Sequence, residues 1–432
     1  MKLRLAMLLV CFCAFGVGSA NGQQVPLDEA ADQLAAAAAG EQNLSPEFKD
    51  ALTNFLAALR GNAPSIIEQL PLSIEPGPPT FWDRVHPFGD IRLRYENDHN
   101  RPDMDARNRE RVRLRIGATI DIAPEWEAGF RVRTGNPDDP NSPHQTLDGM
   151  FDSFEWNLDR AYLRYTPDWT VGLSVVGGKF AHPFARNPVY GELVWDADVN
   201  PEGIAGSYKR KVGDRYSVAL HAGEYILQEQ DKGDEASLFA AQGVAEAKWN
   251  DDWSSKAAVA YYQYVNLVPD GSGFTLMDNG GFNRVVDKNG DGMNDNFASD
   301  FRILNPWFSV TYHGWDYPVT LSGEGIVNTA SEGTDHDGYA LGVAIGRVSR
   351  ARDWRLFYQF QRVERDAVFA AFAQDDFVMP SNFKGHVFGG DYGLTDRVSV
   401  RVWGLVTTMI NTPAGFNDDD QVRMRVDLNA KF

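Results

Sequence analysis

The sequence is nearly without cysteine. Its 432 residues include two cysteines, Cys11 and Cys13, and both lie in an apolar run close to the first residue. Residues 1–22 are typical of a secretory signal peptide, because a charged start precedes this run and small residues follow it. The mature chain would therefore have no cysteine, which excludes disulfide bonds and thiolate metal sites.

A second long apolar run and an excess of positive charge are also missing. No later stretch is long and apolar enough to predict a membrane-spanning helix. The formal net charge of −19 argues against nucleic acid as a partner. The eight histidines show no HExxH spacing, and no G-x-S-x-G or complete G-x-G-x-x-G sequence occurs. We therefore expect no enzymatic activity and no cofactor, apart from the calcium ion considered below.

Residues 23–80 differ in kind from the rest of the chain. The segment 27–39 is rich in alanine, and residues 45–59 combine a good helix start with helical spacing of apolar side chains. Residues 71–79 are rich in proline, which is typical of a stiff linker. We expect a short α-helical extension, and two roles stay open for it. It is either a small spacer or a segment for oligomerisation or cell-wall contact.

The twelve residues at the end of the chain, 421–432, alternate strictly between polar and apolar side chains. This period of two predicts a strand with two unlike faces. The pattern recurs in segments that begin near residue 88. They lie near 90–96, 111–122, 126–133, 158–166, 169–179, 203–212, 215–225, 238–249, 253–264, 302–313, 318–328, 337–347, 354–364, 383–394, 397–408 and 421–432.

The connections between these segments alternate between short turns and long loops. The long ones include 134–157, 180–202, 265–301, 365–382 and 409–420. Short periplasmic turns and long outer loops are the signature of outer-membrane barrels, so we expect 265–301 and 365–382 outside the cell. A tryptophan follows several short turns, as in an interfacial aromatic belt; these are Trp126, Trp169, Trp253 and Trp354. Residues 81–432 are therefore predicted to form an all-β, transmembrane antiparallel β-barrel of about 16 strands.

Several stretches resemble the putative porin family of Gram-negative outer membranes. They are GDIRLRYEN (89–97), RVRLRIGATI (111–120), LDRAYLRYTP (158–167), GGKFAHPF (177–184), VWDADVNPEGIAG (194–206) and NFKGHVFGGDYGL (382–394). The resemblance spans about residues 85–432. It implies a water-filled channel for small hydrophilic solutes, assembled as a homotrimer in outer-membrane lipid. The N-terminal extension would then lie in the periplasm. Phe432 resembles the C-terminal aromatic residue that serves such barrels as an assembly signal.

Arginines crowd the polar face of the first three predicted strands and the last one. They are Arg92, Arg94, Arg111, Arg113, Arg115, Arg131, Arg133, Arg423 and Arg425. Barrel closure would join these strands into one basic wall, with Arg94 beside Arg111 and Arg92 beside Arg113. Because like charges destabilise a sheet, we expect the wall to line the pore and attract anionic groups such as carboxylates. An ordinary solvated face is the alternative.

Acids occur in two of the long connections. The resemblance implies that the loop 180–202 folds into the lumen, where its acids would face the arginine wall at a constriction; they are Glu192, Asp196, Asp198 and Glu202. A solvated outer loop is the alternative. The segment 287–295 matches the start of a calcium loop, with Asp287, Asn289, Asp291 and Asp295 as the candidate ligands. The twelfth position is Ala298 and not Glu, so a plain turn fits equally well.

These features together predict an outer-membrane porin for small hydrophilic, anionic or carboxylate-bearing solutes. Passive diffusion through a charged constriction would need no chemistry. Two other readings stay open. The chain could be a structural outer-membrane protein that contacts peptidoglycan through its N-terminal helices. It could also be an outer-membrane barrel enzyme, although no nucleophile or acid pair stands out.

Overall fold

The computed structural model describes residues 80–99, 105–191, 193–229, 235–267, 282–288, 290, 292, 296–331, 333–412 and 419–432. The chain divides into two compact units, Met1–Pro79 and Thr80–Phe432. All the described residues belong to the second unit. The predicted signal peptide and helical extension therefore lie outside the described residues, Thr80 excepted.

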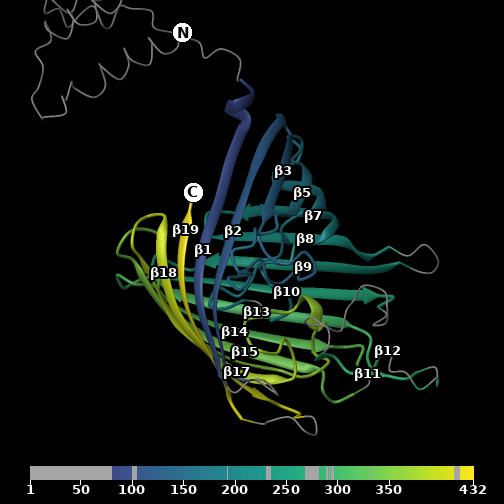
Figure 1. Cartoon of the computed structure of the whole chain (residues 1–432). Helices are drawn as coiled ribbons and strands as arrows, with labels where there is room; N and C mark the ends of the chain where they lie inside the picture. The colour runs from purple at the N-terminus through teal and green to yellow at the C-terminus, as the bar shows by residue number, and fades with distance from the viewer. Residues whose placement is uncertain are drawn as a thin grey trace, which may run out of the picture. The chain divides into compact units, whose positions relative to one another are not determined.

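The described residues form a closed antiparallel barrel of sixteen long strands (Figure 1). The strands are β1 (Val85–His99), β2 (Arg107–Ala123), β3 (Trp126–Arg133), β5 (Asn157–Tyr165), β6 (Leu173–Lys179), β7 (Glu202–Val212), β8 (Tyr216–Gln228), β9 (Ala236–Lys248), β10 (Trp253–Val265), β13 (Arg302–Tyr312), β14 (Val319–Asn328), β15 (Asp337–Gly346), β16 (Trp354–Val363), β17 (Phe383–Gly393), β18 (Val398–Met409) and β19 (Gln421–Lys431). Each pairs with its neighbours in chain order, so the predicted strand number and order are confirmed.

The remaining elements are short. The two residues of β4 (Gln145–Thr146) pair with β2, and β11 (Val285–Val286) pairs with β12 (Asn296–Phe297) in a separate two-stranded sheet. The described residues also include two 3-10 turns, η1 (Phe81–Arg84) and η3 (Ala370–Phe372). Within the described ranges, no helix is long and apolar enough to cross a membrane.

Closure joins the first strand to the last. In β1 and β19, Leu93 lies opposite Leu428 and Arg94 lies opposite Asp427. The backbone groups of Gly89 and Phe432 exchange two hydrogen bonds of 3.0 Å. Every long strand thus has two partners, which leaves the backbone satisfied without an open sheet edge.

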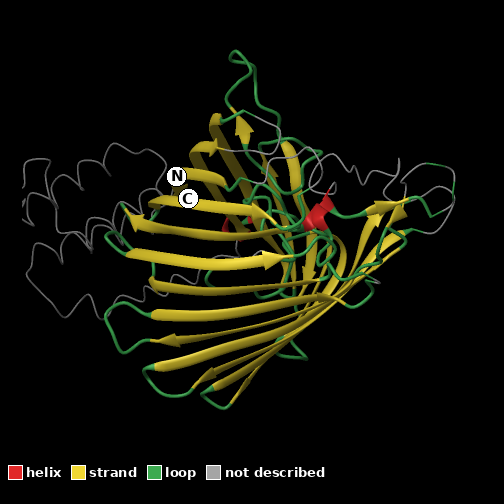
Figure 2. Ribbon diagram, turned by 90° about the horizontal axis from the view of Figure 1, so that it is seen from below, coloured by secondary structure: helices red, strands yellow, loops and turns green. Residues whose placement is uncertain are grey.

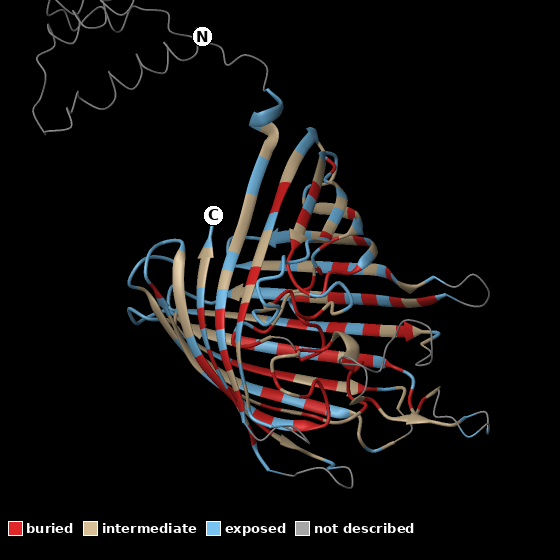
Figure 3. Ribbon diagram, viewed as in Figure 1, coloured by how far each residue is buried: buried red, intermediate tan, exposed pale blue. Residues whose placement is uncertain are grey.

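The barrel has an apolar outer face and a closely packed interior. Burial alternates along the strands (Figure 3), and the exposed positions include Leu158, Leu220, Phe308 and Leu341. Aromatic pairs mark the rim of short turns, because Trp126 contacts Tyr165, Trp253 contacts Tyr312 and Trp354 contacts Tyr317. An apolar band bordered by aromatic residues is the surface that a bilayer requires.

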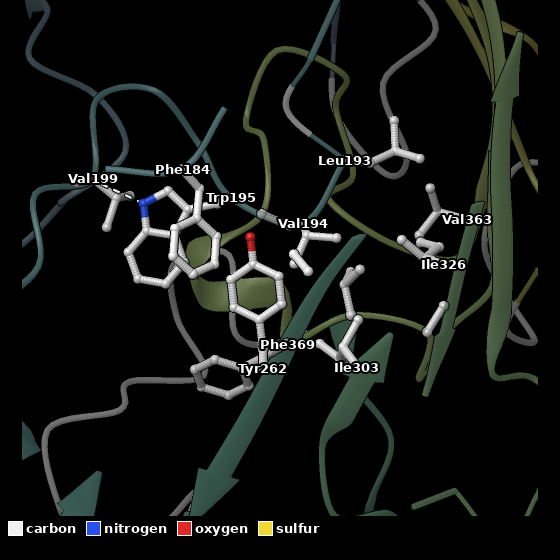
Figure 4. Close-up of a cluster of buried hydrophobic side chains, with 14 of the residues drawn as sticks. Phe184, Leu193, Val194, Trp195, Val199, Tyr262, Ile303, Ile326, Val363 and Phe369 are labelled. Carbon is white, nitrogen blue, oxygen red and sulfur yellow. Dashed lines mark hydrogen bonds between the residues drawn. The ribbon is translucent and has the colours of Figure 1, made fainter. Parts of the chain in front are cut away.

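Two long connections fold into the barrel, where loop segments lie between the walls (Figure 2). Residues 180–191 and 193–201 form one, and residues 364–382 form the other. Both contribute apolar side chains to a buried cluster on the inner face of β10, β13, β14 and β16 (Figure 4). Trp195 of the first loop stacks on Tyr262 with an interplanar angle of 10°, and Phe369 of the second loop contacts Tyr264.

Residues 364–382 therefore do not form an exposed loop, and a segment predicted to lie outside the cell packs inside the barrel instead. Val368, Phe369, Phe377 and Met379 are buried almost completely. The inner face of β10 to β17 is apolar at Tyr264, Ile303, Val363 and Phe383, and it must be covered if it is not to meet water. The two loops cover this apolar part of the inner face.

Candidate functional site

Four neighbouring strands, β19, β1, β2 and β3, carry the predicted arginine wall. In the register of β1 and β2, Arg92 lies opposite Arg113 and Arg94 lies opposite Arg111. This is the pairing that the hairpin predicts. The nine arginines alternate with outward-facing apolar residues, so all of them lie on the inner face of the barrel.

Carboxylates interleave with these arginines, so the expected wall of a single sign does not occur. Arg94 lies 2.7 Å from Asp427, Arg423 lies 2.5 Å from Asp98, and Arg425 lies 2.5 Å from Glu96. Asp90 holds both Arg113 and Arg115, and Asp159 holds Arg131. The physical reason is the burial of these groups. An arginine that has lost water needs a compensating partner, and the acids on the same strands provide it.

Asp198 is the predicted loop acid that reaches the wall. Its carboxylate lies 2.8 Å from Arg115 and 3.7 Å from Arg113. Burial opposes ionisation of this carboxyl, but the two arginines outweigh burial and hold the pKa of Asp198 at about 2. Asp198 therefore stays negative and fixes both guanidinium groups.

The other predicted loop acids have different environments. The Asp196 carboxylate accepts the backbone N–H of Asp198 at 2.6 Å, and the Asp196 N–H donates to the carbonyl of Phe372 at 2.8 Å. Asp196 therefore joins the two inward loops. Glu202 is not a constriction residue, because it begins β7 with an exposed side chain and pairs with Lys179 at 2.5 Å. Glu192 lies outside the described residues.

The second inward loop adds two acids that the sequence prediction missed, Asp375 and Asp376. Asp376 accepts a 2.5 Å hydrogen bond from the Tyr190 hydroxyl and pairs with Arg425. Arg423 donates to the backbone carbonyls of both aspartates, at 3.2 and 2.6 Å. Burial and the adjacent Asp376 carboxylate raise the pKa of Asp375 to about 7. The Asp-Asp pair within a long connection was the available sequence signal.

Three further arginines reach the same space. A register shift between β3 and β5 at Arg131 inserts one extra residue, so that both Asp159 and Arg160 turn inward. Arg355 and Arg401 share Asp391, at 3.5 and 2.6 Å. Arg355 also donates to the carbonyl of Val189 at 2.8 Å, which holds the first inward loop.

These groups surround a polar cavity of about 460 Å³. Arg92, Arg94, Arg113, Arg115, Arg131, Arg160, Arg355 and Arg401 line it, opposed by Asp196, Asp198, Asp375 and Asp376. Apolar and aromatic side chains complete the lining, including Val189, Phe357 and Trp403. Arg94 and Arg401 lie over the Trp403 ring at 5.4 and 5.9 Å from its centroid. Such stacking orients guanidinium groups for paired hydrogen bonds to carboxylates.

Two of the lining arginines have no carboxylate partner among the described residues. The Arg92 guanidinium donates to the amide oxygen of Asn429 at 2.6 Å. The Arg160 guanidinium donates to the amide oxygen of Asn200 at 2.8 Å. An amide oxygen leaves the positive charge in place, so these two side chains can attract an anion from solution.

The calcium and assembly predictions remain untested. Asn289, Asp291 and Asp295 lie outside the described residues. The Asp287 carboxylate accepts the backbone N–H groups of Gly290 and Gly292, at 2.6 and 2.8 Å, which is the geometry of a turn. No group of three or more potential metal ligands occurs among the residues that the structure describes. Phe432 is exposed at the rim.

The barrel fold is shared with solved outer-membrane proteins. The high-pH structure of OprB from Pseudomonas putida superposes with a TM-score of 0.53 at 14% identity, covering 81% of this chain and 94% of that one. OmpF from Salmonella typhi, solved with daunomycin, gives a TM-score of 0.48 at 12% identity over 81% of this chain and 97% of that chain. No curated protein matches the chain. A family model described as putative porin matches residues 99–287 and 309–432, so the chain belongs to the putative porin family of outer-membrane channel proteins.

Proposed function

We propose that this channel passes small anionic solutes, above all those that bear carboxylates. The observation that carries the proposal is the cavity beside the arginine wall. Eight arginines and four aspartates line it, and within the described part of the chain the guanidinium groups of Arg92 and Arg160 have no carboxylate partner. We also propose that the protein works as a homotrimer, with its N-terminal extension in the periplasm.

The path of the solute is set by the two inward loops, which fill part of the lumen. The two inward loops pack on the apolar wall of β10 to β17, so a hydrated solute must pass beside the arginines. Arg92 lies next to Arg113, which Asp90 and Asp198 already hold. The carboxylate of a passing solute binds the guanidinium of Arg92. At the neighbouring Arg113 it competes with the carboxylates of Asp90 and Asp198. This competition keeps binding weak enough for release, as a conducting pore requires.

The test is the reversal potential of the purified channel in a planar bilayer under a KCl gradient. Arg92→Gln combined with Arg160→Gln should shift it toward cations, because two unpaired positive charges are removed. Arg302→Gln is the matched control, since Arg302 is exposed on the outer face of β13 and its loss should leave the potential unchanged. An unaltered potential in the double variant would show that solutes do not pass these arginines.

A further inference from the structure

A second hollow lies beneath the first inward loop, on the inner face of β7, β8, β9 and β10. It measures about 560 Å³, and its lining includes Lys209, Lys211, Ser217, His221, Glu246 and Lys256. A neighbouring hollow of about 550 Å³ shares four of these residues and extends to the short turn at residues 213–215. The two form a continuous space at the end of the barrel where the short turns lie.

The strand registers place four of its polar residues in one row. Lys211 lies opposite Ser217, Ser217 opposite Glu246, and Glu246 opposite Lys256. Adjacent strands are about 4.8 Å apart, so the row spans about 14 Å. In the next inward-facing row, Val244 and Ala258 form a small apolar cluster with Ala185 of the loop. That cluster closes the hollow on the side of the constriction.

The charges that line the hollow are unbalanced. The Glu246 carboxylate lies 2.7 Å from the Lys256 ammonium and accepts the Ser217 hydroxyl at 3.2 Å. Within the described part of the chain, the ammonium groups of Lys209 and Lys211 have no hydrogen-bond or ion-pair partner. They share one face of β7, two residues and about 7 Å apart. Two like charges at this spacing repel each other unless an anion lies between them.

This arrangement differs from the arginine wall. Most arginines there pair with carboxylates, whereas Lys209 and Lys211 have no ion-pair partner among the described residues. A lysine ammonium is a flexible point charge that suits any oxyanion and does not demand the paired geometry of a guanidinium. We propose that Lys209 and Lys211, beside Ser217, form a second anion-binding site, which takes the carboxylate or phosphate group of a solute on the short-turn side of the constriction.

Only the identity of the solute rests on the proposed function, so the site can be tested alone. The sequence outside residues 1–22 has no cysteine, which allows Ser217→Cys to serve as a single thiol probe. Anionic sulfonatoethyl and cationic trimethylammonioethyl methanethiosulfonates report the local potential through their relative rates, each normalised to a free thiol. The anionic reagent should react about tenfold faster, because a positive cleft concentrates anions.

Lys209→Gln with Lys211→Gln in this background should bring the two rates close to parity. Lys179→Gln, on the outer face, is the control and should not change them. Inorganic phosphate and succinate should each slow the anionic reagent in the parent but not in the glutamine variant; protection by one alone assigns the preferred group. Parity in the parent, or no effect of the lysine variants, overturns the site. The proposed function of the constriction is tested separately, by the reversal potential of the variant with Arg92→Gln and Arg160→Gln.

Discussion

Asp375 is a constriction side chain that we expect to change its charge near neutral pH. Burial and the neighbouring Asp376 raise its pKa to about 7, while Arg425 and Arg111 act in the opposite direction. Above this pH the carboxylate offsets part of the arginine charge, and below it the neutral acid does not. Anion selectivity should therefore rise by about twofold as pH falls from about 8 to about 6.

The measurement is the reversal potential at both pH values. Asp375→Asn should remove the change and fix the channel in its more anion-selective state at either pH. Asp391→Asn is the comparison, because Asp391 is tied to two arginines and the variant should keep the pH response. A pH response that survives in Asp375→Asn would assign the titration to another group.

Phe432 is expected to matter for assembly more than for transport. Its backbone closes the barrel on Gly89, and its exposed ring covers the position where Gly89 lacks a side chain. Phe432→Ala should reduce the amount of folded protein in the outer membrane several-fold, without altering the selectivity of the channels that form. Heat-modifiable mobility on gels measures the folded fraction. Met424→Ala, on the same outer face, is the control, and equal levels in both variants would contradict the assembly role.

At the arginine wall, the period of two in the sequence predicts which side chains face the lumen. The pairs Arg92–Arg113 and Arg94–Arg111 follow from the alternation and the hairpin connection. The neutralising partners were less accessible. Asp98 and Asp427 lie on the inner face, where they pair with Arg423 and Arg94. These pairs depend on side-chain directions, which the alternation of apolar and polar residues does not predict. The sequence pattern alone therefore predicted a wall with only positive charges.

At the scale of elements, the loop 364–382 depends on one buried side chain outside it. Asn283 donates to the carbonyls of Arg365 and Val368, at 2.9 and 2.8 Å, and accepts the N–H of Ala370 at 2.8 Å. Asn283→Ala would leave these buried groups unpaired, at about 1–3 kcal/mol each. The loop should then move within the pore and raise current noise in single-channel recordings.

Arg284→Gln serves as the comparison for this loop. Arg284 contacts Asp366 from a more exposed position, so its loss should have a smaller effect on the noise. Quiet recordings from the Asn283 variant, together with unchanged protease resistance of residues 364–382, would show that the buried cluster alone fixes the loop.

The inward course of this loop could not be derived from its length. Outer loops and inward loops are both long. A loop folds inward where the inner face of the barrel has an apolar surface on which it can pack. Tyr264, Ile303 and Val363 make the inner face of three strands apolar, but each occupies a polar position of its predicted strand pattern. The β-bulge at Asp159 was hidden for a similar reason, because one inserted residue shifts the alternation without changing composition.

For the molecule as a whole, orientation in the membrane follows from the alternation of turns and loops. Phe151 is fully exposed in the long connection between β3 and β5, and Asp214 lies in the short turn between β7 and β8. On intact cells, Phe151→Cys should react with a membrane-impermeant maleimide and Asp214→Cys should not. After permeabilisation both should react. The reverse order on intact cells would invert the proposed topology.

The barrel itself was the most predictable feature, since sixteen repeats of one pattern leave little choice of fold. The proposed trimer and the proposed roles of residues 23–80 could not be predicted in this way, because the strand pattern carries no information about either. Contact with the cell wall predicts that purified peptidoglycan retains the full-length protein and loses it when residues 24–70 are deleted. Equal retention of both forms would leave the spacer role.

The division of the lumen into an apolar, loop-covered wall and an arginine wall has a consequence for what travels best. The cavity between them is amphiphilic in cross-section, with Val189 and Phe357 beside Arg92 and Arg113. A molecule with a charged end and a hydrocarbon end can satisfy both sides at once, whereas a uniformly hydrated ion satisfies only one. The permeability of benzoate or butyrate relative to chloride should therefore exceed the ratio of their mobilities in water. The channel would then select molecules by how polar and apolar groups are distributed within them.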